Sequence, residues 1–449
     1  MKRKNTGTLC THITKQKSKK IHLKGSNKKS LELSFSGGNI TSDGGVLLLQ
    51  QADKNLHLTE AISKIFPDPR NQSHITHSWV SMIKQRIFGI ALGYEDLNDH
   101  EYLRKDPAIQ SAVGRESELA STATLFRMEQ TASRKIMVKL HELLFDKFIN
   151  SFKEVPAEII LDFDATDATI HGAQEGRFFN GYYDSYCFLP LYVFCGHHLL
   201  ASYLRSSNKD GARHAWAILS LLVRAIKKIW PDTKIIFRGD SGFCRHRMLS
   251  WCEKHDVNYI IGIAKNSKLL SLAEPYVSAS EEYYDHTQEK QCIFGEVNYS
   301  AKTWDKERRI IVKSEHSDKG ENTRFVVTNC VDDAERIYKE LYCARGDMEN
   351  RIKEQQLGLF ADRISCHHWW PNQLRLLLSG MAYVLLSYIR SHALKGTILA
   401  TAQVETIRLR LLKIGAAIIR NTRRIRFLLS SGFAHQEIFL LAISRLSTS

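Results

Sequence analysis

The order of strand-like and helical segments after Pro156 constrains the fold of this chain more than any other feature. The segments 158–164, 187–195 and 199–205 are rich in β-branched, aromatic and leucine residues, which is typical of strands, and together they predict a meander. The patterns that follow are a helix, a strand, a short helix and a strand, over 210–230, 234–237, 245–255 and 259–263. The order βββαβαβ predicts an α/β fold.

The segments on either side of this core are mainly helical in pattern. Between residues 75 and 148, apolar residues such as Trp79 and Ile83 recur every three or four positions, which predicts helices with one buried face. No segment is marked as a DNA-recognition helix, so the pattern favours a helical bundle over a helix-turn-helix. Short strand-like pieces between 269 and 330 predict a β-rich insertion, and a long helix is predicted over 333–356.

The charge balance is that of a protein with a polyanionic partner. The chain has 63 Lys and Arg against 48 Asp and Glu, a formal net charge of +15. Nucleic acid is one such partner, and a solvated basic surface is the alternative. The first 30 residues contain ten Lys and Arg and no acid, which predicts a disordered basic arm.

Nothing in the sequence predicts export or membrane insertion. The nine cysteines are scattered singly without a C-x-x-C pair, which is typical of reduced thiols in the cytoplasm. The N-terminus lacks the apolar stretch of a signal peptide. The longest apolar run, 374–389, contains Ser and Gly and falls short of the roughly 20 residues that span a bilayer, so we interpret it as a buried core helix.

Acidic residues occur at the ends of two predicted strands. Asp162 and Asp164 are two positions apart and therefore point to the same side of the sheet. They either cap the loop that follows or bind a divalent cation. Asp240 follows the strand 234–237 among small residues, and it either caps the next helix or binds a ligand.

A stripe of polar residues marks the long predicted helix. At about 100° per residue, Tyr342, Arg345, Glu349 and Gln356 fall within a stripe roughly 60° wide. By itself this is an ordinary polar face. With the two strand-end acids it supplies a third carboxylate from a separate segment.

These motifs resemble the DDE transposases of bacterial insertion sequences, group 1, whose catalytic domain has an RNase H-like fold. The resemblance is carried by Leu-Asp-Phe-Asp-Ala-Thr-Asp at 161–167, Gly-Tyr-Tyr at 181–183 and Arg-Gly-Asp-Ser-Gly-Phe at 238–243. The words Gly-Tyr-Glu-Asp-Leu-Asn-Asp at 93–99 and Phe-Arg-Met-Glu at 126–129 also match, so the resemblance extends over most of the chain. It implies an RNase H-like mixed-sheet core with a β-rich insertion, flanked by N-terminal and C-terminal helical regions.

The resemblance implies that Asp164, Asp240 and Glu349 are the catalytic residues and the metal ligands. Asp162 and Asp167 are rivals to Asp164, which we prefer because the Ala-Thr after it matches the family pattern. The cofactor implied is a pair of Mg²⁺ ions, with Mn²⁺ as a substitute.

The resemblance also implies DNA contacts from the long helix. Tyr342 and Arg345 match the Tyr-Arg-Glu-Lys signature of the wider class, in which Arg345 would bind phosphate and Tyr342 would either contact the DNA end or pack into the core. Gln356 stands where the signature has Lys, and Lys353, one turn earlier, is its possible substitute. In the C-terminal arginine cluster, Arg423 and Arg424 would add salt-dependent phosphate contacts.

The function implied is binding of insertion-sequence ends, Mg²⁺-dependent cleavage and joining of the 3′-hydroxyl to target DNA. The partners expected are double-stranded DNA and a second copy of the chain, at the nucleoid in the cytoplasm and not at a membrane. A structure-selective nuclease on the same fold and a domesticated, non-cleaving DNA-binding protein are the alternatives. The histidines at 197–198 and 367–368 lack the spacing of zinc ligands, and no Gly-rich segment has a P-loop lysine.

The expected organisation has six parts. They are a disordered basic arm (1–30), a mainly helical DNA-binding or dimerisation region (31–155), the first part of the RNase H-like core (156–265), the β-rich insertion (266–332), the core helix carrying the catalytic Glu (333–364) and a C-terminal helical basic region (365–449).

Overall fold

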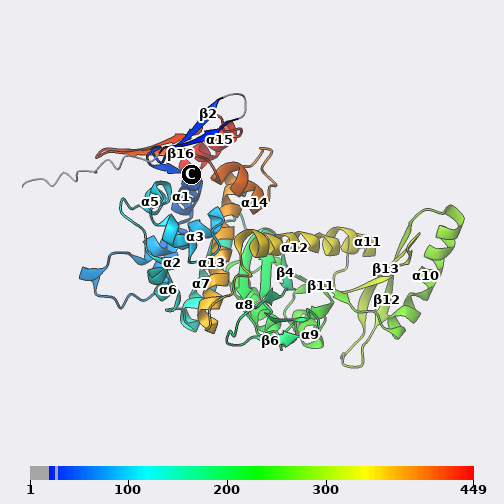
Figure 1. Ribbon diagram of the computed structural model, residues 1–449. Coiled ribbons are helices and arrows are strands. Elements are labelled where there is room, and N and C mark those ends of the chain that lie inside the picture. The colour runs from blue at the N-terminus through cyan, green and yellow to red at the C-terminus, as the bar shows by residue number, and fades with distance from the viewer. Residues whose placement is uncertain (1–19, 26–28, 449) are drawn as a thin grey trace, which may run out of the picture.

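A mixed β-sheet forms the centre of the computed structural model, which describes residues 20–25 and 29–448 (Figure 1). Three parallel strands lie side by side in it: β4 (Glu158–Ala165), β10 (Lys234–Gly239) and β11 (Asn258–Ile263). The antiparallel strands β8 (Leu191–Cys195) and β9 (His198–Tyr203) extend the sheet beyond β4. Helices α8 (Ala215–Ile229) and α9 (His246–Lys254) connect the parallel strands. In the central sheet the order βββαβαβ is therefore confirmed, and the fold is a mixed α/β core built on a large mixed sheet.

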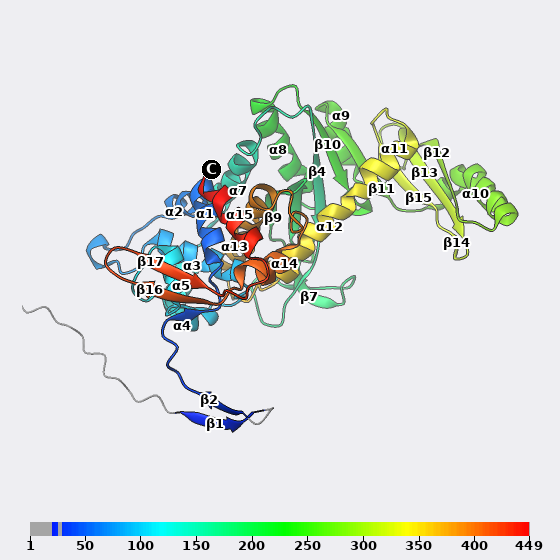
Figure 2. The same ribbon diagram turned by 90° about the horizontal axis from the view of Figure 1, so that it is seen from above.

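The alternation of side chains along β4 explains how the layers pack. Ile159, Leu161 and Phe163 are buried against α8 and α9 in one core cluster. Asp162 and Asp164, which alternate with these apolar residues along β4, point to the opposite face of the sheet. The long predicted helix crosses that face. Figure 2 shows α8 and α9 on one side of β4 and β10, and α12 on the other. Because the period of a strand is two, one strand supplies both the apolar core and the acids.

The long helix expected over 333–356 is present as a continuous but irregular helical path. It consists of α11 (Ala334–Arg336), a π-helical stretch (Ile337–Tyr342), a 3₁₀ turn (Cys343–Arg345), α12 (Gly346–Lys353) and a second π-helical stretch (Glu354–Gly358). Such wide turns often occur at functional sites. They also mean that the uniform 100° per residue used for the polar stripe does not hold along this path.

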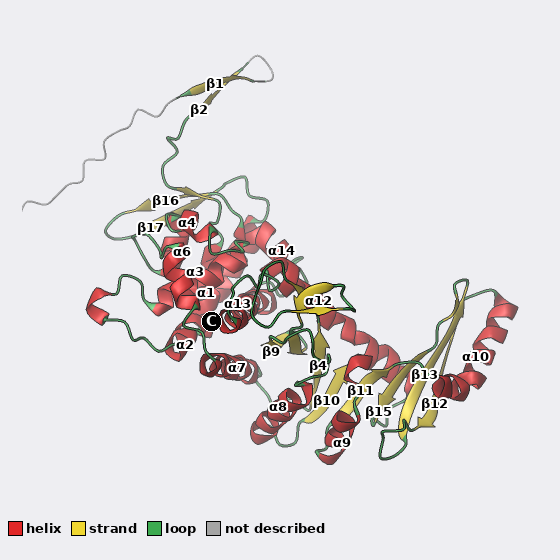
Figure 3. Cartoon of the chain, turned by 60° about the horizontal axis from the view of Figure 1, so that its bottom comes forward, coloured by secondary structure: helices red, strands yellow, loops and turns green. Residues whose placement is uncertain are grey.

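The expected β-rich insertion does not form a sheet of its own. Strand β15 (Arg324–Thr328) pairs with β11, and β13 (Arg308–Ser317), β12 (Gln291–Tyr299) and β14 (Gly320–Glu321) continue the central sheet from there. The segment also contains a 21-residue helix, α10 (Ser267–Thr287), which the sequence pattern did not predict. Figure 3 shows α10 beside β12 and β13. Asn266 caps this helix by accepting a hydrogen bond from the Leu269 amide at 3.0 Å.

The helical regions before and after the core pack into one bundle. Helix α13 (Trp369–Tyr388), which contains the longest apolar run, is buried between α3 (Trp79–Leu92) and the face of β9. The remaining helices of these regions are α1 (Val46–Leu56), α2 (Leu58–Ile65), α4 (Asp99–Leu103), α5 (Pro107–Val113), α6 (Thr122–Glu129), α7 (Arg134–Ile149), α14 (Val404–Ile407) and α15 (Gln436–Ser447), with short 3₁₀ or π turns at Gln72–His74, Ile389–Ala393 and Arg408–Leu412. None of the helices within the described ranges combines the length and apolar character needed to cross a bilayer.

Several expected elements differ in the structure. The single strand expected over 187–195 is two, β7 (Ser185–Phe188) and β8, because Pro190 interrupts it, and β7 pairs with β5 (Ala168–Thr169) and β6 (Phe178–Asn180) in a small sheet. The arginine cluster expected in helices lies partly on a hairpin of β16 (Ala416–Arg420) and β17 (Ile425–Leu429), to which β3 (Ile40–Thr41) adds. Buried Ala416 and Ile418 alternate with more exposed neighbours there, the period of a strand.

The basic arm is described only in part. Strand β1 (Ile21–Lys24) pairs with β2 (Ser30–Leu33), so this piece of the expected disordered arm is a hairpin strand. Residues 1–19 and 26–28, on which the rest of that expectation falls, lie outside the described residues.

Candidate active site

Two parallel strands bring two of the predicted acids to one edge of the sheet. Asp164 lies near the C-terminal end of β4, and Asp240 directly follows β10. The register pairs Arg238 with Asp162, so the positions two residues further along each strand lie next to each other. Glu349, on α12, approaches this edge from the face that carries Asp164.

Arg345 connects the helix to the strand by contacting two of the acids. Its Nη1 donates to Asp164 Oδ2 at 3.2 Å, and its Nη2 donates to Glu349 Oε1 at 2.6 Å. The Asp164 side chain is only 15% exposed, and the Glu349 side chain is 44% exposed. One guanidinium therefore lies between a buried and an open carboxylate.

Burial strongly perturbs the pKa of Asp164. Its pKa is raised to about 6, first because burial disfavours the charged carboxylate, and further because Asp240 and Glu349 lie nearby; Arg345 opposes the rise. Asp240 also accepts a hydrogen bond from the Gly242 amide at 2.9 Å and thereby caps the 3₁₀ turn after β10. The capping role weighed for Asp240 is thus present in the structure, within the same cluster of charges.

Asp162 has a different environment from Asp164, although both are on the same face of β4. It is 3% exposed and forms a bidentate ion pair with Arg238, whose Nη2 lies 2.7 Å from Asp162 Oδ2. Arg238 also donates to the carbonyl of Leu341 and so ties the sheet to the helix that carries Tyr342. Burial raises the pKa of Asp162, and the guanidinium of Arg238 opposes that rise. Arg238 was not singled out from the sequence, where only the register of two distant strands would reveal it.

A cavity of about 350 Å³ opens beside Asp240 and Arg345. Tyr342 and Tyr338 form its aromatic wall, and the exposed side chains of Lys265 and Arg324 add positive charge. Lys265 and Arg324 were also missed from the sequence. Arg324 belongs to the segment expected to form the β-rich insertion, which was not placed beside the acids. The cavity combines cations with aromatic rings, the groups that bind phosphates and stack on bases.

The glycine at position 262 allows Tyr342 to approach the sheet. A Cβ added to Gly262 would lie 2.6 Å from the Tyr342 hydroxyl and 3.1 Å from the Ser241 amide nitrogen. A side-chain carbon at position 262 would therefore fit only if one of these two neighbours moved. The close packing of the helix on β11 therefore depends on this glycine.

The two candidates for the last position of the helix signature behave differently. Gln356 donates from Nε2 to Thr166 Oγ1 at 3.3 Å and to the Asp167 carbonyl at 2.8 Å, so it holds the loop that follows Asp164. Lys353 is exposed on α12. Asp167, the other rival ligand, accepts a hydrogen bond from Thr169 at 3.2 Å.

Arg423 and Arg424 are not brought to this edge. They lie in the exposed turn between β16 and β17, where their amides donate to Asn421 Oδ1 at 3.1 and 2.9 Å. Figures 1 and 2 both place this hairpin beside α5 and away from α12.

The chemistry of the three acids fits a hard divalent cation, because all of their donor atoms are carboxylate oxygens. In the arrangement described for residues 20–25 and 29–448, no three His, Cys, Asp or Glu side chains stand close enough together to form a metal-binding group. The guanidinium of Arg345 instead balances the charge of Asp164 and Glu349. The carboxylates therefore have the chemistry of metal ligands, and Arg345 is their partner in this structure.

Residues 23–449 match the family described as Transposase DDE domain group 1. The chain belongs to this family of DDE transposases. A solved structure similar to this transposase is the piggyBac transposase synaptic complex with hairpin DNA, with a TM-score of 0.41 and 9% identity over 83% of this chain and 80% of that one. No curated protein sequence matches the chain. DDE transposases in general use divalent metal ions.

Proposed function

We propose that this transposase binds the ends of an insertion sequence, cleaves them by Mg²⁺-dependent hydrolysis and joins the resulting 3′-hydroxyl to target DNA. The observation that carries the proposal is the convergence of Asp164, Asp240 and Glu349, from two strands and a helix, at one edge of the sheet beside a basic and aromatic cavity. Membership of the DDE transposase family supports it.

Asp164, Asp240 and Glu349 are the proposed metal ligands, for Mg²⁺ or, as a substitute, Mn²⁺. Two such ions would activate the attacking oxygen and stabilise the leaving oxygen of the phosphodiester. Asp162 is left out of this set because Arg238 already satisfies both of its carboxylate oxygens. Its proposed task is to hold β4, β10 and the helix in register.

Arg345 has two proposed partners in the reaction cycle. In the structure it neutralises Asp164 and Glu349, which reduces the repulsion between neighbouring carboxylates. When DNA enters, the guanidinium turns to a backbone phosphate and binds it bidentately, which frees both acids. Because a phosphate replaces the carboxylates, the positive charge of Arg345 has an anionic partner before and after DNA enters.

The other contacts follow from the cavity beside Asp240. Lys265 and Arg324 bind phosphates, Tyr342 contacts the DNA end, and Lys353 reaches the backbone from the exposed side of α12. Gln356 positions the loop after Asp164 in place of a phosphate contact.

The proposal extends to the assembly. Arg423 and Arg424, exposed on their hairpin turn, add salt-dependent contacts to double-stranded DNA away from the acids. Two copies of the chain hold two element ends, and the complex acts at the nucleoid in the cytoplasm. The net charge of +15 supports an electrostatic attraction to DNA.

The test uses labelled duplex DNA that carries the element's end, with Mg²⁺, Mn²⁺ or EDTA, and a second duplex as target. Wild type is compared with Asp240→Ala and Glu349→Ala, and with Asp232→Ala, which removes an exposed acid between α8 and β10. We expect metal-dependent cleavage and joined products from wild type and Asp232→Ala and neither from the two active-site variants. Cleavage without joining would identify a nuclease, and binding without cleavage in any metal would identify a DNA-binding protein.

A further inference from the structure

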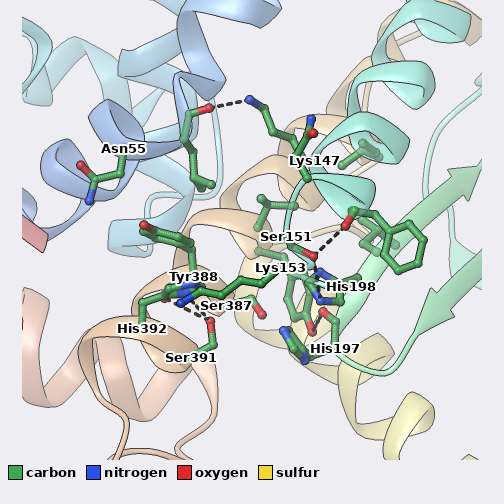
Figure 4. Close-up of a pocket in the computed structure, with 17 residues that line it drawn as sticks. Asn55, Lys147, Ser151, Lys153, His197, His198, Ser387, Tyr388, Ser391 and His392 are labelled. Carbon is green, nitrogen blue, oxygen red and sulfur yellow. Dashed lines mark hydrogen bonds between the residues drawn. The ribbon is translucent and has the colours of Figure 1, made fainter. Parts of the chain in front are cut away.

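A second cavity, of about 370 Å³, lies between the helical bundle and the sheet (Figure 4). Its walls come from the end of α7, the turn between β8 and β9, and the end of α13 with the residues after it. The polar and charged side chains that line it are Asn55, Lys147, Asn150, Ser151, Lys153, His197, His198, Ser387, Ser391 and His392.

This cavity is distinct from the candidate active site. Asp164 pairs with Tyr192 on β8, and Cys195, where β8 ends, lies three residues further from the acids. At about 3.3 Å per residue the turn that carries His197 and His198 begins about 10 Å from the level of Asp164, at the opposite end of the strands.

Basic residues line the cavity. They are two lysines and three histidines, and no carboxylate lines it. The cations Arg351, Arg390, Lys153 and Lys395 act on His197 or His392, and the three histidines also act on one another. Arg351 and Arg390 are ion-paired with Glu354, at 3.0 and 2.7 Å. Lys147, which donates to the Leu56 carbonyl at 2.5 Å, has Asp53 and Asp146 nearby.

The histidines remain neutral as a result. Burial lowers the pKa of all three histidines, to about 3 for His198, and nearby cations lower the pKa of His197 and His392 further, while the Tyr388 carbonyl opposes the fall at His392. The negative charge of a bound anion would oppose the lowering of these pKa values by the nearby cations.

Ser387 gives independent support for a ligand. The residue is 5% exposed, and its buried Oγ interacts with the Tyr383 side chain, although no hydrogen bond of normal geometry joins the two within the described chain. Its neighbour Tyr383 donates to the His197 carbonyl at 3.0 Å. By contrast, the other two serines of the cavity donate to backbone carbonyls of Phe148 and Tyr388. A buried hydroxyl without a hydrogen bond of normal geometry is uncommon, because leaving it unpaired costs free energy.

Lys153 and the rings of the cavity complete the match to an organic anion. No hydrogen bond or ion pair of the Lys153 ammonium occurs among the described residues, and Figure 4 shows the side chain extending toward His392. Phe148 and Tyr388 supply apolar walls. We propose that this cavity binds a small organic phosphate, up to the size of a mononucleotide, through Lys153, Ser387 and the histidines.

The test is calorimetric titration of the full chain with inorganic phosphate and with AMP, without divalent metal. We expect saturable binding of one AMP per chain, tighter than that of phosphate. Lys153→Gln and His392→Gln each remove a charged or polar contact, so each should weaken AMP binding about tenfold. Ser387→Ala should weaken it about fivefold. The control Lys395→Gln removes a cation that acts on His392 without lining the cavity, and it should change the affinity less than about twofold.

The inference would be overturned by the absence of binding at millimolar AMP, or by equal affinities in all four variants. Displacement of AMP by a short duplex DNA would also overturn it, because the phosphate would then come from a DNA backbone. Asp240→Ala should bind AMP as wild type does, and a loss there would place the ligand in the active site. Circular dichroism of each variant verifies that the fold is retained.

Discussion

Asp164→Asn should stabilise the folded chain while it abolishes cleavage. The pKa of Asp164 is raised from its ordinary 3.8 to about 6, because the charged form is buried near two other acids. The difference of about 2.2 pH units corresponds to about 3 kcal/mol at about 1.36 kcal/mol per unit. Asn keeps the size of the side chain and removes the charge. In EDTA at pH 7.5, we expect the variant to unfold with a free energy about 1–3 kcal/mol above that of wild type.

The gain should depend on pH in a direction that the linkage fixes. Since the carboxyl of Asp164 has a higher pKa in the folded state, the folded state binds its proton more readily. The free-energy penalty for burying the charged carboxylate is therefore absent below about pH 4, where the group is protonated in both states. It grows as pH rises through the interval from about 4 to 6 and is complete above that. At pH 5 the advantage of Asp164→Asn should therefore be about half of its value at pH 7.5.

Asp162→Asn is the matched control, because it makes the same substitution on the same face of the same strand. Asp162 is paired with Arg238, which is 5% exposed, and the substitution leaves that guanidinium without its countercharge. Loss of one partner of a buried ion pair costs about 3–5 kcal/mol. Burial also raises the pKa of Asp162, which offsets part of that cost, so Asp162→Asn should be less stable than Asp164→Asn.

Urea unfolding followed by circular dichroism measures both variants at pH 5 and pH 7.5, and the cleavage assay measures activity. Mg²⁺ should stabilise wild type and have little effect on Asp164→Asn, because only the wild-type site binds it in the folded state. The reasoning fails if Asp164→Asn is less stable than wild type at pH 7.5, or if its advantage is the same at both pH values.

Three further substitutions test other parts of the structure. Gly262→Ala places a Cβ 2.6 Å from the Tyr342 hydroxyl, so cleavage should fall between about tenfold and a hundredfold; wild-type rates would refute the steric argument. Gln356→Ala should lower kcat and cost about 1 kcal/mol in urea unfolding, through the lost bond to the Asp167 carbonyl; an effect on KM alone would contradict a positioning role. Glu129→Gln leaves Arg86 and Arg375 without their shared buried partner and should cost about 3 kcal/mol by the same measurement, where a loss below about 1 kcal/mol would count against it.

Local patterns were sufficient for much of the core. The strand order after Pro156 and the positions of Asp164 and Asp240 at strand ends follow from runs of a few apolar residues and the residues that end them. Such signals depend on neighbours in the chain, which is why they can be read without the fold. The same local reading failed for α10 and for the hairpin β16–β17. In both cases the element contacts strands that are distant in the chain. Helix α10 packs on β12 and β13, and β16 pairs with β3.

The composition of the site depends on residues far apart in the chain. Asp162 and Asp164 are indistinguishable by strand period, and only the register with β10 gives Asp162 an arginine partner while Asp164 faces Arg345. The cation Arg324 reaches the cavity, beside Lys265, only because β15 joins β11. Charge pairing and cavity lining depend on separation in space, which the spacing of residues along a chain does not specify.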